Sequence, residues 1–158
     1  MKINENFLEN NNFIKLQELI FNLDFPWRIR NGTTHKDNNY YFTHSFFDKH
    51  KINSEYFDYY ISPIIEKLKV KSLIQVRANM FLSKLFDKSS FHIDQNYKCK
   101  TSILYLNSCN GGTEFKKNNN IEFIKAEENK LITFNNVEHR AVTSTDCSIR
   151  FILNFNYF

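Results

Sequence analysis

The feature that most constrains the fold of this chain is a period-two alternation of apolar and polar side chains that begins near residue 72. Successive side chains of a strand point to opposite faces, so this alternation predicts half-buried β-strands. Asn110, Gly111 and Gly112 mark a turn between two of these segments. Several short strands joined by tight turns favour a sandwich, a barrel or a jelly roll. The predicted strands span residues 72–82, 100–107, 113–115, 121–125, 130–134, 138–143 and 148–158.

The first 70 residues follow a different, helical pattern. Phe13, Leu16, Ile20 and Leu23 recur at helical spacing and predict one buried face. Pro26 should follow the end of this helix, because the residue before a proline avoids the helical conformation. Helices that precede an antiparallel core are expected to support it from outside.

A second helix is predicted from Ser54, a residue type that caps helix N-termini, to Lys69. Pro63 should kink this helix or divide it into two short ones. Between the two helical regions, residues 40–44 are β-prone and predict a further strand. The buried face of the second helix is expected to hold Tyr56, Tyr60, Ile64 and Leu68.

Length and composition limit the possible classes of protein. A chain of 158 residues is long enough for one domain with a substantial core. Hydrophobic residues make up 42% and aromatic residues 16%, which excludes a disordered chain. The net charge of +4 is dispersed, and the densest basic stretch, residues 67–71, is short. A nucleic-acid partner is therefore not expected, since such binders concentrate their basic charge.

The cysteines and the N-terminus suggest the cellular setting. Cys99, Cys109 and Cys147 are odd in number and widely spaced, so we expect free thiols in a reducing compartment. Residues 1–12 have no apolar core of a signal peptide, and no apolar run approaches the roughly 20 residues of a membrane span. The expected location is the cytoplasm, without membrane attachment.

The chemistry of the chain is concentrated at His92 and Asp94. Positions i and i+2 of an extended segment point to the same side, so both side chains can bind one ion. His139 precedes another predicted strand and is the expected third ligand. Two histidines and one carboxylate on one face of a metal are typical of non-haem iron(II) oxygenases. An H-x-D pair alone is weak evidence, and its setting in a β-rich region supports the interpretation.

Arg150 lies eleven residues after His139 in the last predicted strand. If its face is buried, the guanidinium needs a partner, and a carboxylate is the natural one. The alternative is a surface arginine on a half-exposed strand. The hydroxyls of Tyr105 and Thr101 share one strand face and could reach the same carboxylate, although strand tyrosines often only fill the core.

From about Leu73 to Phe158, the chain resembles the 2-oxoglutarate and iron(II)-dependent oxygenase superfamily. It is most similar to the prolyl-4-hydroxylase-like branch and its short bacteriophage members. The N-terminal segments 25–27 and 42–47 also resemble phage-type proteins. The segments that carry the main resemblance are His92-Ile93-Asp94, residues 101–107, 111–115 and 129–134, His139, Arg150 and residues 154–157.

The resemblance implies a fold, a site and a reaction. The family fold is a double-stranded β-helix, a cupin-like jelly roll with flanking helices. It would form one domain over residues 1–158, with residues 1–70 as helical support and substrate-side segment and residues 71–158 as jelly-roll core. His92, Asp94 and His139 match the iron ligands. Arg150 and Tyr105 match residues that hold the far carboxylate of 2-oxoglutarate. The implied reaction consumes O₂ and 2-oxoglutarate and yields a hydroxylated substrate, succinate and CO₂.

The sequence departs from the family at several positions. Residues 135–138, before His139, lack the proline or glycine of many relatives, and the interval to Arg150 is slightly longer than in animal prolyl hydroxylases. Met80 and Leu82 stand where some relatives place a tyrosine. This last departure concerns the cosubstrate contacts and leaves the ligands unaffected.

The substrate is not readable from the sequence, because specificity depends on loops. The resemblance suggests a prolyl peptide, and other peptides and small molecules such as free amino acids or nucleobases stay open. A lid would come from residues 32–51 or 84–90. The oligomeric state is not indicated. The candidates for the substrate pocket are His44, Arg77, Asn154 and Asn156.

Three other readings remain. The first is a catalytically silent jelly roll that binds a metal and a small ligand. The second is a cupin-like isomerase or sugar-binding protein, which would not require an arginine placed for a dicarboxylate. The third is a basic nucleic-acid-binding module, whose affinity would fall steeply with salt.

Overall fold

The computed structural model describes residues 1–32, 39–83, 85–118 and 120–158. The described strands form an eight-stranded sheet in the order β1-β9-β6-β11-β5-β3-β2, with β4 paired to β3, and a three-stranded sheet in the order β10-β7-β8. All strand pairs are antiparallel. The strands are β1 Lys2–Asn4, β2 Arg28–Asn31, β3 Tyr40–Asp48, β4 Lys51–Ile52, β5 Leu73–Leu82, β6 Lys100–Tyr105, β7 Gly112–Lys117, β8 Asn120–Lys125, β9 Leu131–Asn135, β10 His139–Val142 and β11 Ile149–Tyr157.

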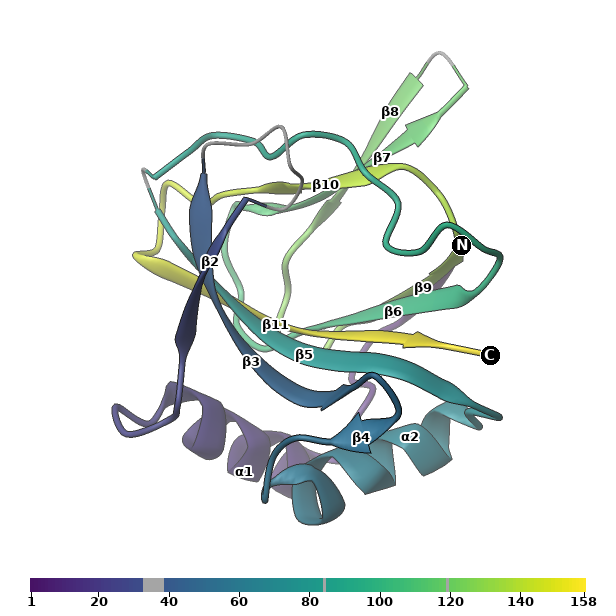
Figure 1. Cartoon of the computed structure of the whole chain (residues 1–158). Coiled ribbons are helices and arrows are strands. Elements are labelled where there is room, and N and C mark those ends of the chain that lie inside the picture. Colours follow the sequence, from purple (N-terminus) through teal and green to yellow (C-terminus); the bar gives the residue numbers. More distant parts are fainter. Residues whose placement is uncertain (33–38, 84, 119) are drawn as a thin grey trace.

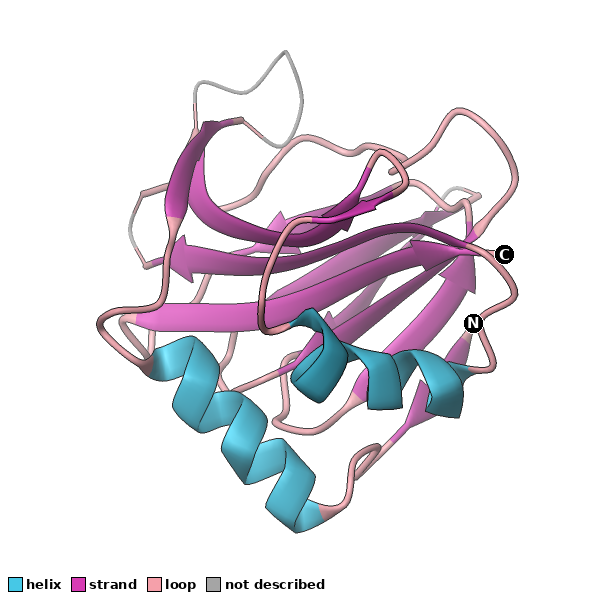
Figure 2. Ribbon diagram, turned by 60° about the horizontal axis from the view of Figure 1, so that its bottom comes forward, coloured by secondary structure: helices cyan, strands magenta, loops and turns pink. Residues whose placement is uncertain are grey.

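Three helical elements cover one face of the large sheet. They are α1 (Asn10–Phe21), a π-helical turn η1 (Phe57–Ile61) and α2 (Ser62–Leu68). Figure 1 shows these helices on one side of the large sheet and the small sheet on the other, and Figure 2 shows both helices against the same sheet face. The small sheet faces the large one (Figure 1).

Both faces of the central strands are buried. Toward the helices, a main core packs Leu16 and Ile20 of α1 against Val76 of β5 and Leu153 of β11. Toward the small sheet, a second cluster includes Ile103, Tyr105, Phe115, Phe134 and Ile152. Because alternate side chains point to opposite faces, each central strand contributes to both clusters. The helices therefore cover the first cluster, and the small sheet covers the second.

The sequence predicted the β-rich part well. Every predicted segment from residue 72 onward coincides with a strand, and so does the segment at residues 40–44, which extends to Asp48 as β3. The pattern missed β1, β2 and β4, which contain three, four and two residues respectively. Strands so short are too brief to establish a period of two.

Both helix predictions need a correction. The helix α1 ends at Phe21, and Leu23, which was predicted to lie on its buried face, is 100% exposed. Asn22 has an extended backbone with ψ of 138°, so the chain leaves the helix before Leu23 can face the core.

The second helical region begins at Phe57 rather than Ser54. Its buried residues are Phe57, Ile61 and Ile64, whereas Tyr56, Tyr60 and Leu68 are only partly buried, because the π-helical turn η1 changes the spacing of the buried face. The predicted division at Pro63 is confirmed, because Pro63 lies in the first turn of α2 directly after η1.

The turn at residues 110–112 needs glycine for a steric reason. Gly112 begins β7 and pairs with β8 so closely that an added Cβ would overlap with the carbonyl oxygen of Ile124. Among the described residues, no helix is both long enough and apolar enough to cross a membrane.

Candidate metal centre

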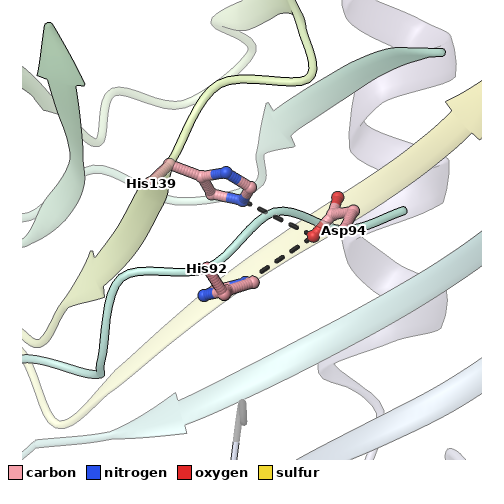
Figure 3. A group of neighbouring side chains, drawn as sticks. All are labelled: His92, Asp94 and His139. Atoms are coloured by element: carbon pink, nitrogen blue, oxygen red, sulfur yellow. Dashed lines mark ion pairs between the residues drawn. The ribbon is translucent and has the colours of Figure 1, made fainter. Parts of the chain in front are cut away.

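The structure brings His92, Asp94 and His139 together between the two sheets. Their potential ligand atoms all lie within 4.8 Å of one another. Nε2 of His92 is 3.6 Å from Oδ1 of Asp94, and Nε2 of His139 is 3.5 Å from the same oxygen. Figure 3 shows both imidazoles directed toward this carboxylate. Two nitrogens and one oxygen thus converge on one point.

Backbone hydrogen bonds hold the two histidines side by side. His139 is the first residue of β10, and His92 lies in the connection between β5 and β6. The amide of His92 donates to the carbonyl of His139 at 3.0 Å, and the reverse bond measures 2.9 Å. This single antiparallel bridge places residues 47 positions apart in the sequence at adjacent sites, with ring centroids 4.6 Å apart.

The other nitrogen of each imidazole is held by the backbone. Nδ1 of His139 lies 2.9 Å from the carbonyl oxygen of Val137, and Nδ1 of His92 lies 3.2 Å from that of Ser90. A carbonyl can only accept, so each Nδ1 carries the proton and each Nε2 keeps its lone pair. Metal-bound histidines are oriented by this kind of outer contact.

Asp94 is oriented by three polar side chains. Its Oδ2 accepts hydrogen bonds from Asn156 at 2.8 Å, and from Thr101 and Asn154 at 3.3 Å each. Asn156 also donates to Thr101 at 3.1 Å, which links β11 to β6 behind the carboxylate. Because these partners all use Oδ2, Oδ1 remains directed at the two histidines.

The protonation states suit a cation. Burial would raise the pKa of Asp94, but the proximity of His92 and His139 and the hydrogen bond from Asn156 together lower it well below its usual range. Burial lowers the pKa of His139, although Asp94 partly opposes this shift. The carboxylate is therefore ionised near neutral pH and His139 is neutral, which is the state that each needs as a ligand.

A cavity of about 300 Å³ extends from the three side chains into the molecule. Arg150 lines it and is only 1% exposed. Among the described residues, no group accepts a hydrogen bond from its Nε or Nη2. Cζ of Arg150 lies 4.6 Å from the centroid of the Phe81 ring, and burial lowers the pKa of Arg150. A buried guanidinium with two unpaired N–H groups is costly unless an anion binds there.

Neither Tyr105 nor Thr101 lines the cavity. Tyr105 is fully buried, and its hydroxyl donates to Oγ1 of Thr113 at 2.8 Å. Burial raises the pKa of Tyr105 to about 12, so it remains a donor. Thr113, which the sequence had not singled out, lines the cavity. Thr101 contacts Asp94 and Asn156, as described above, and is absent from the cavity wall.

The substrate-pocket candidates separate into two groups. Arg77 and Asn154 line the cavity. Asn156 is buried behind Asp94 and contacts it. His44 lies elsewhere, with its ring nitrogens 3.1 Å from the carbonyl oxygen of Pro26 and 2.8 Å from the Ser54 hydroxyl. Tyr41, on the opposite face of β3, reaches the cavity instead, because alternate strand residues point to opposite sides.

The proposed lid segments are only partly described. Residues 33–38 and residue 84 lie outside the described residues, and most of the remainder of 32–51 forms β3 and β4. The connection at 85–90 is attached to β10, since Ser89 donates its amide to Ala141 and Thr143 donates to Asp87.

Sequence reasoning missed an ion-pair cluster beside the centre. Glu114 of β7 accepts from Lys88 and from Nε of Arg140, each at 2.7 Å, and Arg140 lies 4.2 Å from the ring of Phe91. The cluster ties the segment that carries His92 to the strand that carries His139. No local sequence pattern predicts this ion-pair cluster, because its members come from three separate segments.

The three cysteines are free, as predicted. The fold nevertheless brings Cys109 and Cys147 near Asp146, with ligand atoms within 4.8 Å of one another. The sequence contains no C-x-x-C spacing that would have indicated this group.

The residues present fit iron(II) and 2-oxoglutarate. Two neutral imidazoles and one carboxylate on one side of a point are the donor set of non-haem iron(II) oxygenases. The unpaired guanidinium of Arg150 in the same cavity fits the far carboxylate of a dicarboxylate. This donor set, together with such an arginine, is typical of 2-oxoglutarate and iron(II)-dependent oxygenases.

Solved structures of this class superpose on nearly the whole chain. The prolyl hydroxylase of Trichoplax adhaerens, in complex with a hypoxia inducible factor oxygen degradation domain peptide fragment, has a TM-score of 0.76 and 16% identity, covering 99% of this chain and 82% of its own. An oxidoreductase of the 2OG-Fe(II) oxygenase family from Burkholderia pseudomallei has a TM-score of 0.74 and 9% identity, covering 97% and 81%. A Pseudomonas putida prolyl-4-hydroxylase has a TM-score of 0.70 and 11% identity, covering 99% and 91%.

These likenesses confirm the predicted fold class, a mainly β double-stranded β-helix with N-terminal helices. No family model matches the chain, and no curated protein matches it by sequence. A fold shared at such low identity leaves the activity to be argued from the site.

Proposed function

We propose that this protein is a non-haem iron(II) and 2-oxoglutarate-dependent dioxygenase that hydroxylates its substrate and releases succinate and CO₂. The observation that carries the proposal is one cavity that contains both a His-Asp-His cluster and the unpaired guanidinium of Arg150. A metal-binding cupin-like jelly roll would not require an arginine placed to bind a dicarboxylate. A positive group buried without a partner is retained where a ligand supplies the anion.

The residues would divide the work as follows. His92, Asp94 and His139 would hold iron(II), which supplies the oxidising chemistry when 2-oxoglutarate and O₂ are also present. Arg150 would orient the cosubstrate through a forked contact to its far carboxylate. The apolar side chains of Phe81, Ile103 and Ile152, which line the cavity, would keep water from the reacting groups.

Tyr105 would act through Thr113. The Tyr105 hydroxyl donates to Oγ1 of Thr113, so the hydroxyl hydrogen of Thr113 is left to point into the cavity. Thr113 would then donate to the carboxylate that Arg150 binds. Tyr105 would then be a positioning residue at the cosubstrate end, in place of the direct contact that the resemblance implies.

The substrate class follows from the resemblance and stays a proposal. A prolyl or other peptide residue is the first choice, because two of the compared structures are prolyl hydroxylases. The similarity to short bacteriophage proteins, drawn from segments such as 42–47 and 154–157, suggests a phage-type enzyme in the host cytoplasm. One domain over residues 1–158 would carry the whole activity.

The test is the visible charge-transfer absorption of anaerobic protein loaded with iron(II) and 2-oxoglutarate. We expect a band in the wild type, none in His139→Ala, and at least about tenfold weaker 2-oxoglutarate binding in Arg150→Lys, which keeps a charge and loses the fork. Arg28→Gln, an exposed arginine outside the cavity, is the matched control and should behave as wild type. A folded, metal-loaded wild type without the band would contradict the proposal and favour a silent or cupin-like jelly roll.

A further inference from the structure

The outer part of the same cavity has two arginines that the proposed cosubstrate does not use. Arg30 of β2 and Arg77 of β5 line the cavity together with Tyr41, Gln75 and Asn154. Arg30 belongs to an exposed strand, whereas Arg150 is completely enclosed. Arg30 and Arg77 therefore mark the open end of the cavity, and Arg150 marks its closed end.

The open end carries more positive than negative charge. Arg77 donates to Oδ2 of Asp48 at 3.3 Å, and its side chain is only 20% exposed. Within the described parts of the chain, Arg30 has no ion-pair partner. Because Arg30 and Arg77 line one cavity, their like charges repel each other, and burial followed by the charge of Arg30 lowers the pKa of Arg77. Asp48 thus pairs with Arg77, and no described carboxylate pairs with Arg30.

The metal centre cannot compensate for this excess. With both groups bound, the charges of iron(II) and Arg150 would balance those of Asp94 and the two carboxylates of 2-oxoglutarate. The loaded centre would be neutral overall, and the positive charge at the open end would remain. A substrate group of opposite charge would complement it.

We propose that the substrate carries an oxyanion, a carboxylate or a phosphate, which Arg30 and Arg77 bind at the mouth of the cavity. This inference rests on the proposed function. Two guanidinium groups offer forked donors that match such oxyanions, and Gln75 and Tyr41 line the same cavity. Mutual repulsion between the arginines would be relieved when the anion binds. The contact would place an acidic peptide or small acidic molecule above the iron.

The test uses radiolabelled sulfate and acetate in equilibrium dialysis against anaerobic protein loaded with iron(II) and saturating 2-oxoglutarate, in excess chloride at constant ionic strength. We expect about one anion bound per protein, with roughly tenfold weaker binding in Arg30→Gln and in Arg77→Gln. Arg28→Gln, on the same strand and outside this cavity, is the control and should bind as wild type. Preferential retention of sulfate would indicate a phosphate-bearing substrate, and retention of acetate a carboxylate.

The inference is overturned if neither anion is retained above chloride, or if both variants retain the anion as wild type does. Arg30 is exposed, so its substitution tests the site without threatening the fold. The charge-transfer band, recorded on the same samples, separates the two proposals. A band without anion binding leaves the dioxygenase and removes the anion site. Anion binding that depends on Arg30, without a band, leaves the anion site and removes the dioxygenase.

Discussion

Each ligand candidate at the metal centre is oriented by a contact on the side away from the others. Backbone carbonyls of Ser90 and Val137 hold the two Nδ1 atoms, and Asn156 with its neighbours holds Oδ2 of Asp94. These contacts reduce the number of orientations that a metal ion must select. Outer contacts of this kind alter metal affinity by roughly 10- to 100-fold.

Substitution Asn156→Ala should therefore weaken metal binding by about tenfold or more, because Oδ2 of Asp94 loses its shortest hydrogen bond. The visible absorption of bound Co(II) during titration measures this affinity. Asn110→Ala removes an amide that contacts only the remote Thr145 region and is the control. Unchanged Co(II) affinity in folded Asn156→Ala would show that the amide does not position the ligand.

Glu114→Gln should cost about 2 kcal/mol of stability near neutral pH, because two charge-assisted hydrogen bonds at 2.7 Å are weakened. Burial would raise the pKa of Glu114, but the bonds from Lys88 and Arg140 lower it below its usual value. A lowered pKa stabilises the fold above the ordinary glutamate pKa, and this contribution is lost as pH falls through the folded value. The difference from wild type should thus shrink below about pH 4.

Urea unfolding at several pH values measures this difference. Glu122→Gln, which removes an exposed ion pair with Lys117, should change stability by less than about 0.5 kcal/mol and serves as the control. A cost for Glu114→Gln that stayed constant from pH 7 to pH 3 would contradict the assigned role.

Among the elements, α1 supports the large sheet from the side opposite the metal centre. Ile20 is fully buried against the sheet, whereas Leu23, just past the helix, is 100% exposed. Ile20→Ala should destabilise the protein by about 3 kcal/mol, and Leu23→Ala should have nearly no effect. Chemical denaturation followed by far-UV circular dichroism measures both. Equal effects would mean that the helix ends differently from the structure described above.

In the whole molecule, the helical first part and the β-rich second part share one core. β3 of the first part pairs with β5 of the second, and the ring centroids of Trp27 and Phe151 of β11 lie 5.9 Å apart. We therefore expect one cooperative unfolding transition over residues 1–158. Fluorescence of Trp27, the sole tryptophan, should coincide with circular dichroism in urea. Two separate transitions would divide the chain into independent parts.

Much of this architecture could be predicted from local patterns. The strands from residue 72 onward follow from their period of two, and His92 with Asp94 follows from i, i+2 spacing in an extended segment. The end of α1 was misjudged because Leu23 continues the helical spacing after the backbone has left the helix. The strands β1, β2 and β4 were missed because sheet partners, rather than their own sequence, stabilise them.

By itself, then, the sequence determined the order of the longer strands, the face on which most of their residues lie, and the i, i+2 pair of His92 and Asp94, since these depend on periodicity and neighbouring positions. Only the tertiary structure decided which side chains meet across the sheets. It joined His139 to His92, left Nε and Nη2 of Arg150 without a hydrogen-bond acceptor among the described residues, inserted Thr113 between Tyr105 and the cavity, and turned His44 away. The physical reason is that such contacts depend on the register and packing of strands distant in sequence, which no local pattern specifies.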